Sequence, residues 1–352
     1  MSEALISVEN LAVNFAGRGR MFGPPPAPVK AVNDVSFSIQ PGRTFGLVGE
    51  SGSGKSTVAR AILQLVDIHA GTIRLEGEDV TRVARRDELR FRKRVQAVLQ
   101  DPFSSLNQVH QTGTIIGDGI TRHKGTKGSE RDNEVRRLLD EVGLSGDYLA
   151  RYPYEMSGGQ RQRISIARAL GVGPKLIIAD EATSALDVSI QSQVINLLQD
   201  IQKEDGVAFL FIAHDLEVVS HISHDVGVMY LGYLVERGDA DSVYEQPAHP
   251  YTEMLLSSIP VPNPAEQAVR RQLRKAFIDG EPPSPANLPK GCPFANRCPV
   301  AMDICTEEMP DITPAHDGGA VRCHLHTSGP ELGGGSVVDF IKSQARRTAD
   351  AS

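Results

Sequence analysis

The apolar residues of this chain follow two spacings, one typical of strands and one typical of helices. Alternation of apolar and polar residues predicts half-buried strands at 6–15 and 32–39, and a short strand at 71–75. Nearly continuous apolar runs predict strands that are buried on both faces, at 43–48, 95–99, 176–181 and 207–213. Helices are expected at 58–65, 87–94, 130–142, 164–170 and 188–204.

Strands that alternate with helices predict an α/β core with a mainly parallel sheet. A hairpin around Leu231-Gly232 is expected to join 225–230 to 233–235. The composition then changes, because nine prolines fall between 260 and 299. We therefore expect an α/β domain over 1–258, a Pro-rich, loop-rich C-terminal domain over 259–330, and a flexible tail over 331–352.

A glycine-rich segment lies between the strand at 43–48 and the helix at 58–65. It reads Gly49-Glu50-Ser51-Gly52-Ser53-Gly54-Lys55-Ser56-Thr57 and fits the phosphate-binding loop pattern G-x-x-x-x-G-K-[ST]. Glycines let backbone N–H groups wrap phosphate oxygens, and the following helix N-terminus adds partial positive charge. Lys55 is placed to reach the β- and γ-phosphates, and the Ser56 hydroxyl to bind Mg²⁺. The alternative, a chance glycine-rich turn, is disfavoured by the strand before the segment and the helix after it.

Polar side chains follow three of the predicted buried strands. They are Gln100, the pair Asp180-Glu181, and His214. The carboxyl ends of parallel strands share one edge of a sheet, where such sheets bind ligands. We assign Asp180 to Mg²⁺ and Glu181 to orienting or deprotonating water, with Gln100 near a metal-bound water. Taken singly, Gln100 is typical of an exposed loop and His214 of a structural histidine, but three polar groups at three strand ends indicate one site.

Two further segments are candidates for nucleotide contacts. Ser157-Gly158-Gly159-Gln160 precedes a helix, and is either a second anion site or a helix start that Ser157 caps. Phe15, near the end of the first strand, either stacks on a purine ring or packs as an ordinary aromatic. The residues alone leave both questions open.

Composition and charge exclude some classes of protein. The chain has 352 residues and a net charge of −7, so no overall basic field favours nucleic acid as a partner. It has no run of 18 apolar residues, and Met1-Ser2-Glu3-Ala4 lacks a signal-peptide pattern. We therefore expect a cytosolic protein, whose role at a membrane would need a partner.

All four cysteines lie beyond residue 290, as Cys292-x5-Cys298-x6-Cys305-x17-Cys323. Cysteines so close together in a cytosolic protein argue against disulfides. A Cys₄ zinc site, a [4Fe–4S] cluster and unligated thiols remain as alternatives, although the gaps are longer than the usual zinc spacing. His324 and His326 are either substitute ligands or surface residues.

Taken in order, these segments resemble the ATP-binding-cassette (ABC) ATPase family over residues 5 to about 258. The resemblance rests on Phe15, the loop 49–57, Gln100, the signature Ser157-Gly158-Gly159-Gln160, Asp180-Glu181, the loop Ser184-Ala185-Leu186-Asp187, and His214. The signature is the most specific part, because other phosphate-loop ATPases lack it. Met156 and Ala182 depart from the usual Leu and the frequent Pro. The resemblance implies an ABC-type core with a mainly parallel sheet, an antiparallel β subdomain and a helical signature subdomain at about 101–170.

The resemblance also implies a mechanism. Two such domains sandwich two ATP molecules, and the signature of one contacts the γ-phosphate held by the other, so a lone chain holds half of each site. The family pattern implies that Phe15 stacks on adenine and that the loop 49–57, with Lys55, binds the phosphates. It further implies that Ser56, Asp180 and Gln100 hold Mg²⁺. Glu181 would be the catalytic base, and His214 would contact the γ-phosphate.

More narrowly, the chain resembles the ATPase subunits of oligopeptide and dipeptide importers. The matching stretches are 48–52, 100–107, 184–191, 249–252 and the tail from Gly291. This resemblance implies peptide import at the cytoplasmic face of the membrane, with a second and different ATPase subunit, two transmembrane permease subunits, an extracytoplasmic substrate-binding protein, and a [4Fe–4S] cluster on the four cysteines. The subfamily also includes importers of nickel, opines and sugars, so the cargo stays open.

Two alternatives from other classes are a soluble ABC ATPase acting on ribosomes or DNA, and half of a drug exporter. Ribosome-acting members usually carry two cassettes, whereas this chain has one phosphate loop. The gap between Leu99 and Ser157 is too short for the coiled coils of DNA-acting members. Exporter halves usually carry fused membrane helices, which no stretch here predicts.

Overall fold

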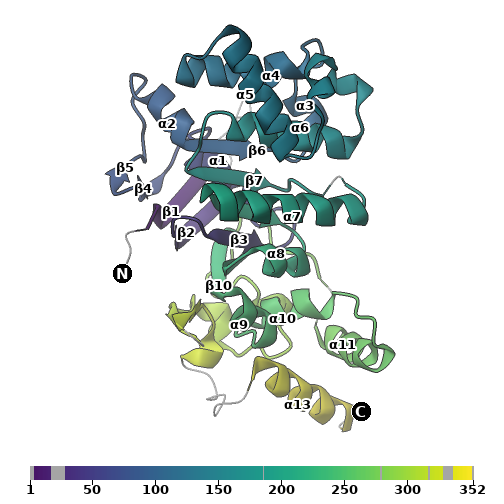
Figure 1. Ribbon diagram of the computed structural model, residues 1–352. Helices are drawn as coiled ribbons and strands as arrows, with labels where there is room; N and C mark the ends of the chain where they lie inside the picture. The colour runs from purple at the N-terminus through teal and green to yellow at the C-terminus, as the bar shows by residue number, and fades with distance from the viewer. Residues whose placement is uncertain are drawn as a thin grey trace, which may run out of the picture.

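The structure is a computed structural model that describes residues 4–16, 28–184, 186–277, 280–315, 318–327 and 336–350 (Figure 1). Its largest element is an eight-stranded sheet in the order β11-β12-β10-β9-β3-β8-β7-β6. The strands are β3 Thr44–Val48, β6 Val95–Val98, β7 Leu176–Asp180, β8 Ala208–Ala213, β9 Asp225–Tyr230, β10 Tyr233–Asp239, β11 Thr313–Pro314 and β12 Ala320–Val321. From β6 to β9 all neighbours are parallel, and the remaining pairs are antiparallel. This confirms the predicted α/β core.

A second sheet is antiparallel, in the order β2-β1-β4-β5. It contains β1 Ile6–Phe15, β2 Val29–Ile39, β4 Ala70–Leu75 and β5 Glu78–Asp79. Its apolar residues share a core with helix α1 (Lys55–Ile62) and with one face of the main sheet, including Leu176 and Ile178. Ile177 and Ala179 lie in the other hydrophobic core. The apolar run of β7 is therefore buried on both faces, as predicted.

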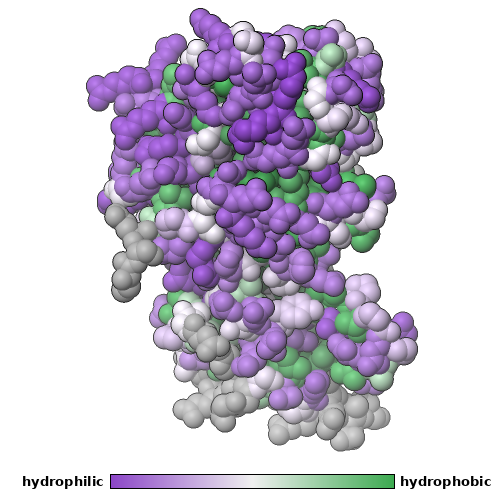
Figure 2. Space-filling view, in the orientation of Figure 1, coloured by the Kyte–Doolittle hydropathy of each residue, from purple (hydrophilic) through white to green (hydrophobic). Residues whose placement is uncertain are grey.

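The helices form a lobe beyond β6 and a layer on the main sheet (Figure 1). The helices up to the end of the lobe are α2 Glu88–Arg94, α3 Pro102–Ser105, α4 Thr112–Lys124, α5 Gly128–Glu141 and α6 Gly158–Leu170, with 3₁₀ turns at Gly146–Ala150 and Pro153–Glu155. The helices that follow β7 and β8 are α7 Val188–Asp205 and α8 Leu216–Ile222. Figure 2 shows this face as mostly hydrophilic, with apolar side chains gathered between the lobe and α7. None of the helices in the described ranges is long and apolar enough to cross a membrane.

Helix α4 is absent from the sequence-based prediction. Its segment contains three glycines and several β-branched residues, which have low helix propensity. The fold uses two of these glycines for close packing, because a Cβ on Gly113 would clash with Leu149 and one on Gly117 with Arg131. Tertiary packing against α5 and the 3₁₀ turn at Gly146–Ala150 therefore overrides the local preference.

The C-terminal part is more regular than the Pro-rich composition predicts. Helices α9 Ala240–Glu245 and α10 Pro250–Ser257 precede it. Beyond residue 258 the chain forms α11 Pro264–Ala276, α12 Ile304–Glu307 and α13 Val337–Asp350, with 3₁₀ turns at Ala295–Arg297 and His324–His326. Helix α11 starts at Pro264, where proline fits the first turn and Asn263 caps the backbone. Helix α13 lies in the segment expected to be a flexible tail, and its Val337 and Ile341 are buried near α10 and α11.

Candidate functional site

The predicted strand-end residues meet along one edge of the main sheet. Val48 of β3 is level with Ala213 of β8, and Val98 of β6 is level with Ala179 of β7. The segments that follow these four parallel strands therefore emerge side by side. They carry the glycine-rich loop, Gln100, Glu181 and His214, and Asp180 is the last residue of β7.

The loop between β3 and α1 has the backbone of a phosphate-binding loop. Gly49 has a φ of +154° and Gly54 a φ of +106°, which side chains rarely allow. A Cβ on Gly49 would also collide with the Met229 carbonyl. Helix α1 begins directly after Gly54, so its first N–H groups face the loop.

Lys55 lies inside this loop with 4% of its surface exposed. Its Nζ donates to the Gly49 carbonyl at 2.7 Å, to the Glu50 carbonyl at 2.9 Å and to the Ser53 Oγ at 3.3 Å. Burial lowers the pKa of Lys55, and the nearby carboxylates of Glu181 and Asp180 oppose that shift. The ammonium group is thus pre-positioned by the loop that it would serve.

Asp180 and Ser56 form a pair of oxygen ligands at the end of β7. Ser56 Oγ donates a hydrogen bond of 3.0 Å to Asp180 Oδ1. Burial raises the pKa of Asp180, which the Ser56 hydrogen bond partly offsets. A hydroxyl and a carboxylate side by side suit a hard cation such as Mg²⁺, whose charge would favour the ionised carboxylate.

Glu181 follows directly, with a φ of +49° that is uncommon for a residue with a side chain. Its backbone N–H donates to the Ile212 carbonyl of β8 at 2.9 Å, which holds this conformation. Gln100 Nε2 donates to Glu181 Oε2 at 2.6 Å. The structure therefore joins these two predicted site residues, and a strained backbone of this kind is frequent at functional positions.

His214 and Phe15 lie nearby in the fold without a hydrogen bond to this group. His214 is exposed directly after β8, at the same sheet edge. Phe15 ends β1 with 38% of its surface exposed, opposite Val29 of β2. The same strand β2 carries Ala31, whose carbonyl would collide with a Cβ on Gly54. The exposed Phe15 ring therefore lies opposite Val29, two residues before Ala31, whose carbonyl lies against Gly54 of the phosphate loop.

The Ser157–Gln160 segment lies at a different place. Ser157 caps α6, and its Oγ accepts a hydrogen bond from the Gln160 N–H at 3.3 Å. Ser157 and Gly158 are exposed, and Gly159 packs close to Ile190 of α7. The helix-cap interpretation is therefore correct locally, and among the described residues no hydrogen bond ties this segment to the loop 49–57.

The loop Ser184–Asp187 connects this edge of the sheet to α7. Ser184 Oγ donates to the Glu181 carbonyl at 3.0 Å, and Asp187 precedes the first turn of α7. Leu186 lies against Gly158. Ala185, also predicted for this loop, lies outside the described residues.

The four cysteines line one small cavity of about 10 Å³ and form no disulfide. Burial raises the pKa of Cys292 to about 11 and that of Cys298 to about 12, and it raises the pKa of Cys323 well above its usual value. The donor set suits a soft metal site, but the cavity has room for about one water. Within the described ranges, no three His, Cys, Asp or Glu side chains are arranged to hold a metal ion. The predicted cluster therefore stays a prediction.

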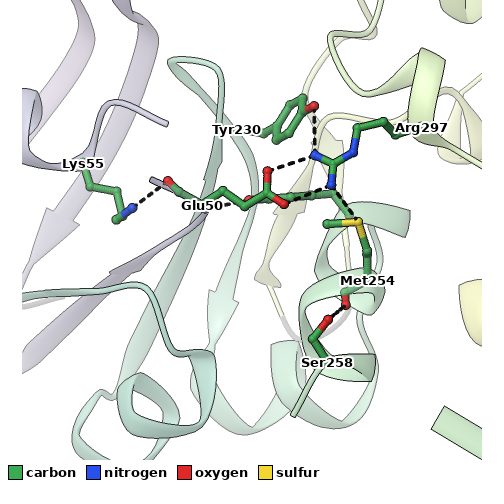
Figure 3. Close-up of polar contacts among 7 residues, drawn as sticks. Glu50, Lys55, Tyr230, Met254, Ser258 and Arg297 are labelled. Atoms are coloured by element: carbon green, nitrogen blue, oxygen red, sulfur yellow. Dashed lines mark hydrogen bonds and ion pairs between the residues drawn. The ribbon is translucent and has the colours of Figure 1, made fainter. Parts of the chain in front are cut away.

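One residue at the site was missed by the sequence analysis. Arg297, next to Cys298, makes a bidentate ion pair with Glu50 of the phosphate loop at 2.9 and 3.0 Å (Figure 3). Glu50 N–H also donates to the Tyr251 hydroxyl at 2.8 Å. Glu50 and Arg297 lie 247 positions apart and leave no spacing signal, so only the adjacent cysteine marks Arg297 in the sequence.

Comparison with known proteins gives consistent matches. Residues 32–184 match the family described as ABC transporter, and residues 235–305 match the oligopeptide/dipeptide transporter C-terminal region. The chain is 48% identical to a probable peptide ABC transporter ATP-binding protein, y4tS of Sinorhizobium fredii, over 92% of this chain and 91% of that protein. It is 46% identical to the oligopeptide transport ATP-binding protein AppF of Bacillus subtilis, over 92% and 98% of the two chains.

A solved structure supports the fold. The ATP-binding cassette MJ0796, determined as a dimer in a post-hydrolysis state with ADP and Pi, superposes with a TM-score of 0.59 at 24% identity. The match covers 67% of this chain and 98% of that one. At this identity the likeness establishes the architecture of the cassette alone.

Proposed function

Because this chain belongs to the ATP-binding proteins of ABC transporters, we propose that it hydrolyses ATP to drive the import of oligopeptides or dipeptides across the cytoplasmic membrane. The observation that carries the proposal is the sheet edge where Lys55, Ser56–Asp180 and Gln100–Glu181 meet. Peptide as cargo is supported by the names of the relatives and by the match at 235–305. Nickel, opines and sugars are the alternative cargoes of the same motor.

Each residue at this edge has a proposed role. Lys55 and the N–H groups of the loop 49–57 bind the phosphates and neutralise their charge. Ser56 and Asp180 would hold Mg²⁺, with Gln100 nearby, and the ion would neutralise the charge of the phosphates. Glu181 accepts a proton from the attacking water, and His214 contacts the γ-phosphate. Phe15 stacks on the adenine ring.

The exposed signature supports a site shared between two subunits. Ser157 and Gly158 face solvent, and Gln160 is held by Tyr148 rather than by the phosphate loop. Ser157, Gly158, Gly159 and Gln160 therefore contact ATP held by a second ABC ATPase subunit, which is a different chain. The loop Ser184–Asp187 packs beside the signature and links it to Glu181.

The surface beyond Gln100 supports contact with membrane subunits. Leu99, Phe103 and Val109 expose 41%, 49% and 76% of their surface around the loop that follows β6. Apolar side chains exposed together are typical of interaction sites. We propose that this loop contacts two transmembrane permease subunits at the cytoplasmic face of the membrane. An extracytoplasmic binding protein delivers the cargo, and no nucleic acid takes part.

The cysteine cavity is proposed to hold a [4Fe–4S] cluster, because four thiols share one buried space. Cys292, Cys298, Cys305 and Cys323 would be the ligands. Binding of the cluster requires that the cavity widen and that thiols with raised pKa values ionise, which metal binding drives. A Cys₄ zinc site and unligated thiols are the alternatives.

The motor proposal is tested by binding and transport together. The purified full chain is titrated with a fluorescent ATP analogue in the presence and absence of Mg²⁺, and Lys55→Ala is the matched loss-of-function variant. We expect Mg²⁺-dependent binding in the wild type, loss of at least tenfold in affinity in the variant, and loss of peptide uptake in cells that carry it. Co-purification with two multi-span membrane proteins distinguishes a transporter from a soluble ABC ATPase. Undiminished uptake with Lys55→Ala would overturn the proposal.

A further inference from the structure

The phosphate loop is tied to the cysteine-bearing C-terminal part by one charged contact. Glu50 is the second residue of the loop, and Arg297 ends the 3₁₀ turn Ala295–Arg297 that precedes Cys298. Arg297 Nη1 donates to Glu50 Oε2 at 2.9 Å, and Nη2 donates to Oε1 at 3.0 Å. Two parallel bonds of this kind are the strongest geometry of an Arg–carboxylate pair. Figure 3 shows the guanidinium facing the carboxylate, with Lys55 on the other side of Glu50.

Arg297 is held in place by aromatic rings. Its side chain is 12% exposed, and its guanidinium carbon lies 5.9 Å from the centre of the Tyr230 ring and 5.7 Å from that of Phe294. The same group donates to the Tyr230 hydroxyl at 3.4 Å. An arginine packed in this way loses little additional freedom when it binds the carboxylate. The contact is therefore pre-formed rather than a mobile surface pair.

Glu50 takes part in the phosphate loop through its backbone as well. Its carbonyl accepts the hydrogen bond of 2.9 Å from Lys55 Nζ, and its N–H is bound by Tyr251. Its carboxylate is also close enough to act on the charge of Lys55. A carboxylate in a loop that binds a triphosphate repels the ligand unless a cation neutralises it. Among the described residues, Arg297 is the cation that forms an ion pair with it.

We propose that Arg297 is a positioning residue for ATP binding: it neutralises Glu50 and fixes the loop that carries it. This inference rests on the proposed function, because it concerns the affinity of the same ATP site. It makes the C-terminal part a component of the nucleotide site rather than an appendix. Loss of Arg297 leaves an unpaired, partly buried carboxylate beside the phosphates.

The chain contains a matched control for this contact. Arg322 also comes from the C-terminal part and donates to Asp34 of β2 at 2.7 Å, with a side-chain exposure of 10%. Its guanidinium carbon lies 5.9 Å from the ring centre of Tyr233. The two arginines thus have similar burial and similar partners, but Asp34 belongs to the antiparallel sheet and not to the loop. Arg322→Ala reports the general effect of loosening the C-terminal part.

The test is equilibrium binding of the fluorescent ATP analogue, with Mg²⁺, to the full-length chain. We compare the wild type with Arg297→Ala, Arg297→Lys, Glu50→Gln, the double variant Arg297→Ala/Glu50→Gln, and Arg322→Ala. Arg297→Ala is expected to weaken binding by about tenfold or more, because one partner of a partly buried charged pair is lost. Arg297→Lys keeps the positive charge but cannot form the two parallel hydrogen bonds, and it is expected to lose less affinity. The double variant should recover most of the lost affinity, since its carboxylate is gone.

The outcomes separate the inference from the proposed function. An Arg297→Ala protein that binds within twofold of the wild type overturns the inference, as does a double variant no tighter than Arg297→Ala. An equal loss in Arg322→Ala overturns it too, because the effect would then be general loosening. If Arg297→Ala does not fold, the affinities of Arg297→Lys and Glu50→Gln test the inference instead. Wild-type affinity in Arg297→Lys together with a tenfold loss of affinity in Glu50→Gln would contradict the neutralisation of Glu50 by Arg297. A wild type that binds no better than Lys55→Ala overturns the proposed function itself.

Discussion

Gln100 and Glu181 are joined by a hydrogen bond of 2.6 Å, although they lie 81 positions apart in the chain. The amide Nε2 donates to the carboxylate, so the side chain that follows β6 fixes the orientation of the acid that follows β7. Gln100 also begins the loop that leads to the exposed apolar residues Phe103 and Val109. A conformational change at that surface can therefore be transmitted through Gln100 to Glu181, the proposed catalytic base.

The first prediction concerns Glu181 as the base. Glu181→Gln keeps the size of the side chain and is expected to keep ATP binding while lowering hydrolysis by about 10² or more, as for loss of a general base. Single-turnover hydrolysis and nucleotide binding, measured on the same preparation, check this. Glu217→Gln, at an exposed position on α8, is the control and should leave both unchanged. Near-normal turnover in Glu181→Gln would remove Glu181 from this role.

A second prediction concerns the Mg²⁺ ligands. Asp180→Asn removes the carboxylate that accepts a hydrogen bond from the Ser56 hydroxyl, so the pair loses its negative charge. We expect the Mg²⁺ concentration for half-maximal ATP binding to rise by about tenfold, since hard cations favour charged oxygen ligands. Titration of binding with Mg²⁺ at fixed nucleotide measures it. Ser56→Ala should act in the same direction, and an unchanged Mg²⁺ requirement in both variants would refute the assignment.

The dependence of stability on pH follows from a buried acid in α10. Burial raises the pKa of Glu253 from 4.5 to about 7, and Lys342 and Arg270 oppose the shift. The native state therefore keeps a proton that the unfolded chain releases, so the free energy of unfolding falls as pH rises through this interval. The free energy of unfolding of Glu253→Gln should exceed that of the wild type by about 1–3 kcal/mol at pH 8, and the two should be equal near pH 4.5.

Urea denaturation at the two pH values measures this difference. Glu236 is also fully buried, with a pKa raised by burial to about 7, so part of the pH dependence should survive in Glu253→Gln. Glu245→Gln, at an exposed position on α9, is the control and should follow the wild type at both pH values. A Glu253→Gln protein that gains nothing at pH 8 would show that the acid is stabilised in its ionised form.

The cysteine prediction is spectroscopic. Full-length protein purified without oxygen is expected to absorb broadly at about 400 nm and to contain iron and sulfide. Cys298→Ser, which removes a thiol from the shared cavity, should abolish or strongly weaken that absorbance. Stoichiometric zinc without colour would favour the Cys₄ zinc site. A colourless, metal-free preparation that still supports uptake would favour unligated thiols.

The local chemistry of this protein was determined by the sequence. The glycine-rich loop needs a strand before it and a helix after it, and both are visible in the spacing of apolar residues. The β7 run from Leu176 to Asp180 is buried on both faces, so its composition alone identifies a central parallel strand. Parallel strands end at one edge, and therefore Gln100, Glu181 and His214 were predicted together from their positions after separate strands.

Tertiary structure decided the features whose causes are distant in the chain. Helix α4 forms despite its glycines because Gly113 and Gly117 permit close packing on Leu149 and Arg131. Helix α13 is ordered by burial of Val337 and Ile341, which a short amphipathic segment at the end of a chain does not reveal. No spacing or periodicity in the sequence predicts the ion pair between Glu50 and Arg297. Short-range patterns fix strands, helices and loops, whereas contacts between segments far apart depend on how the layers come together.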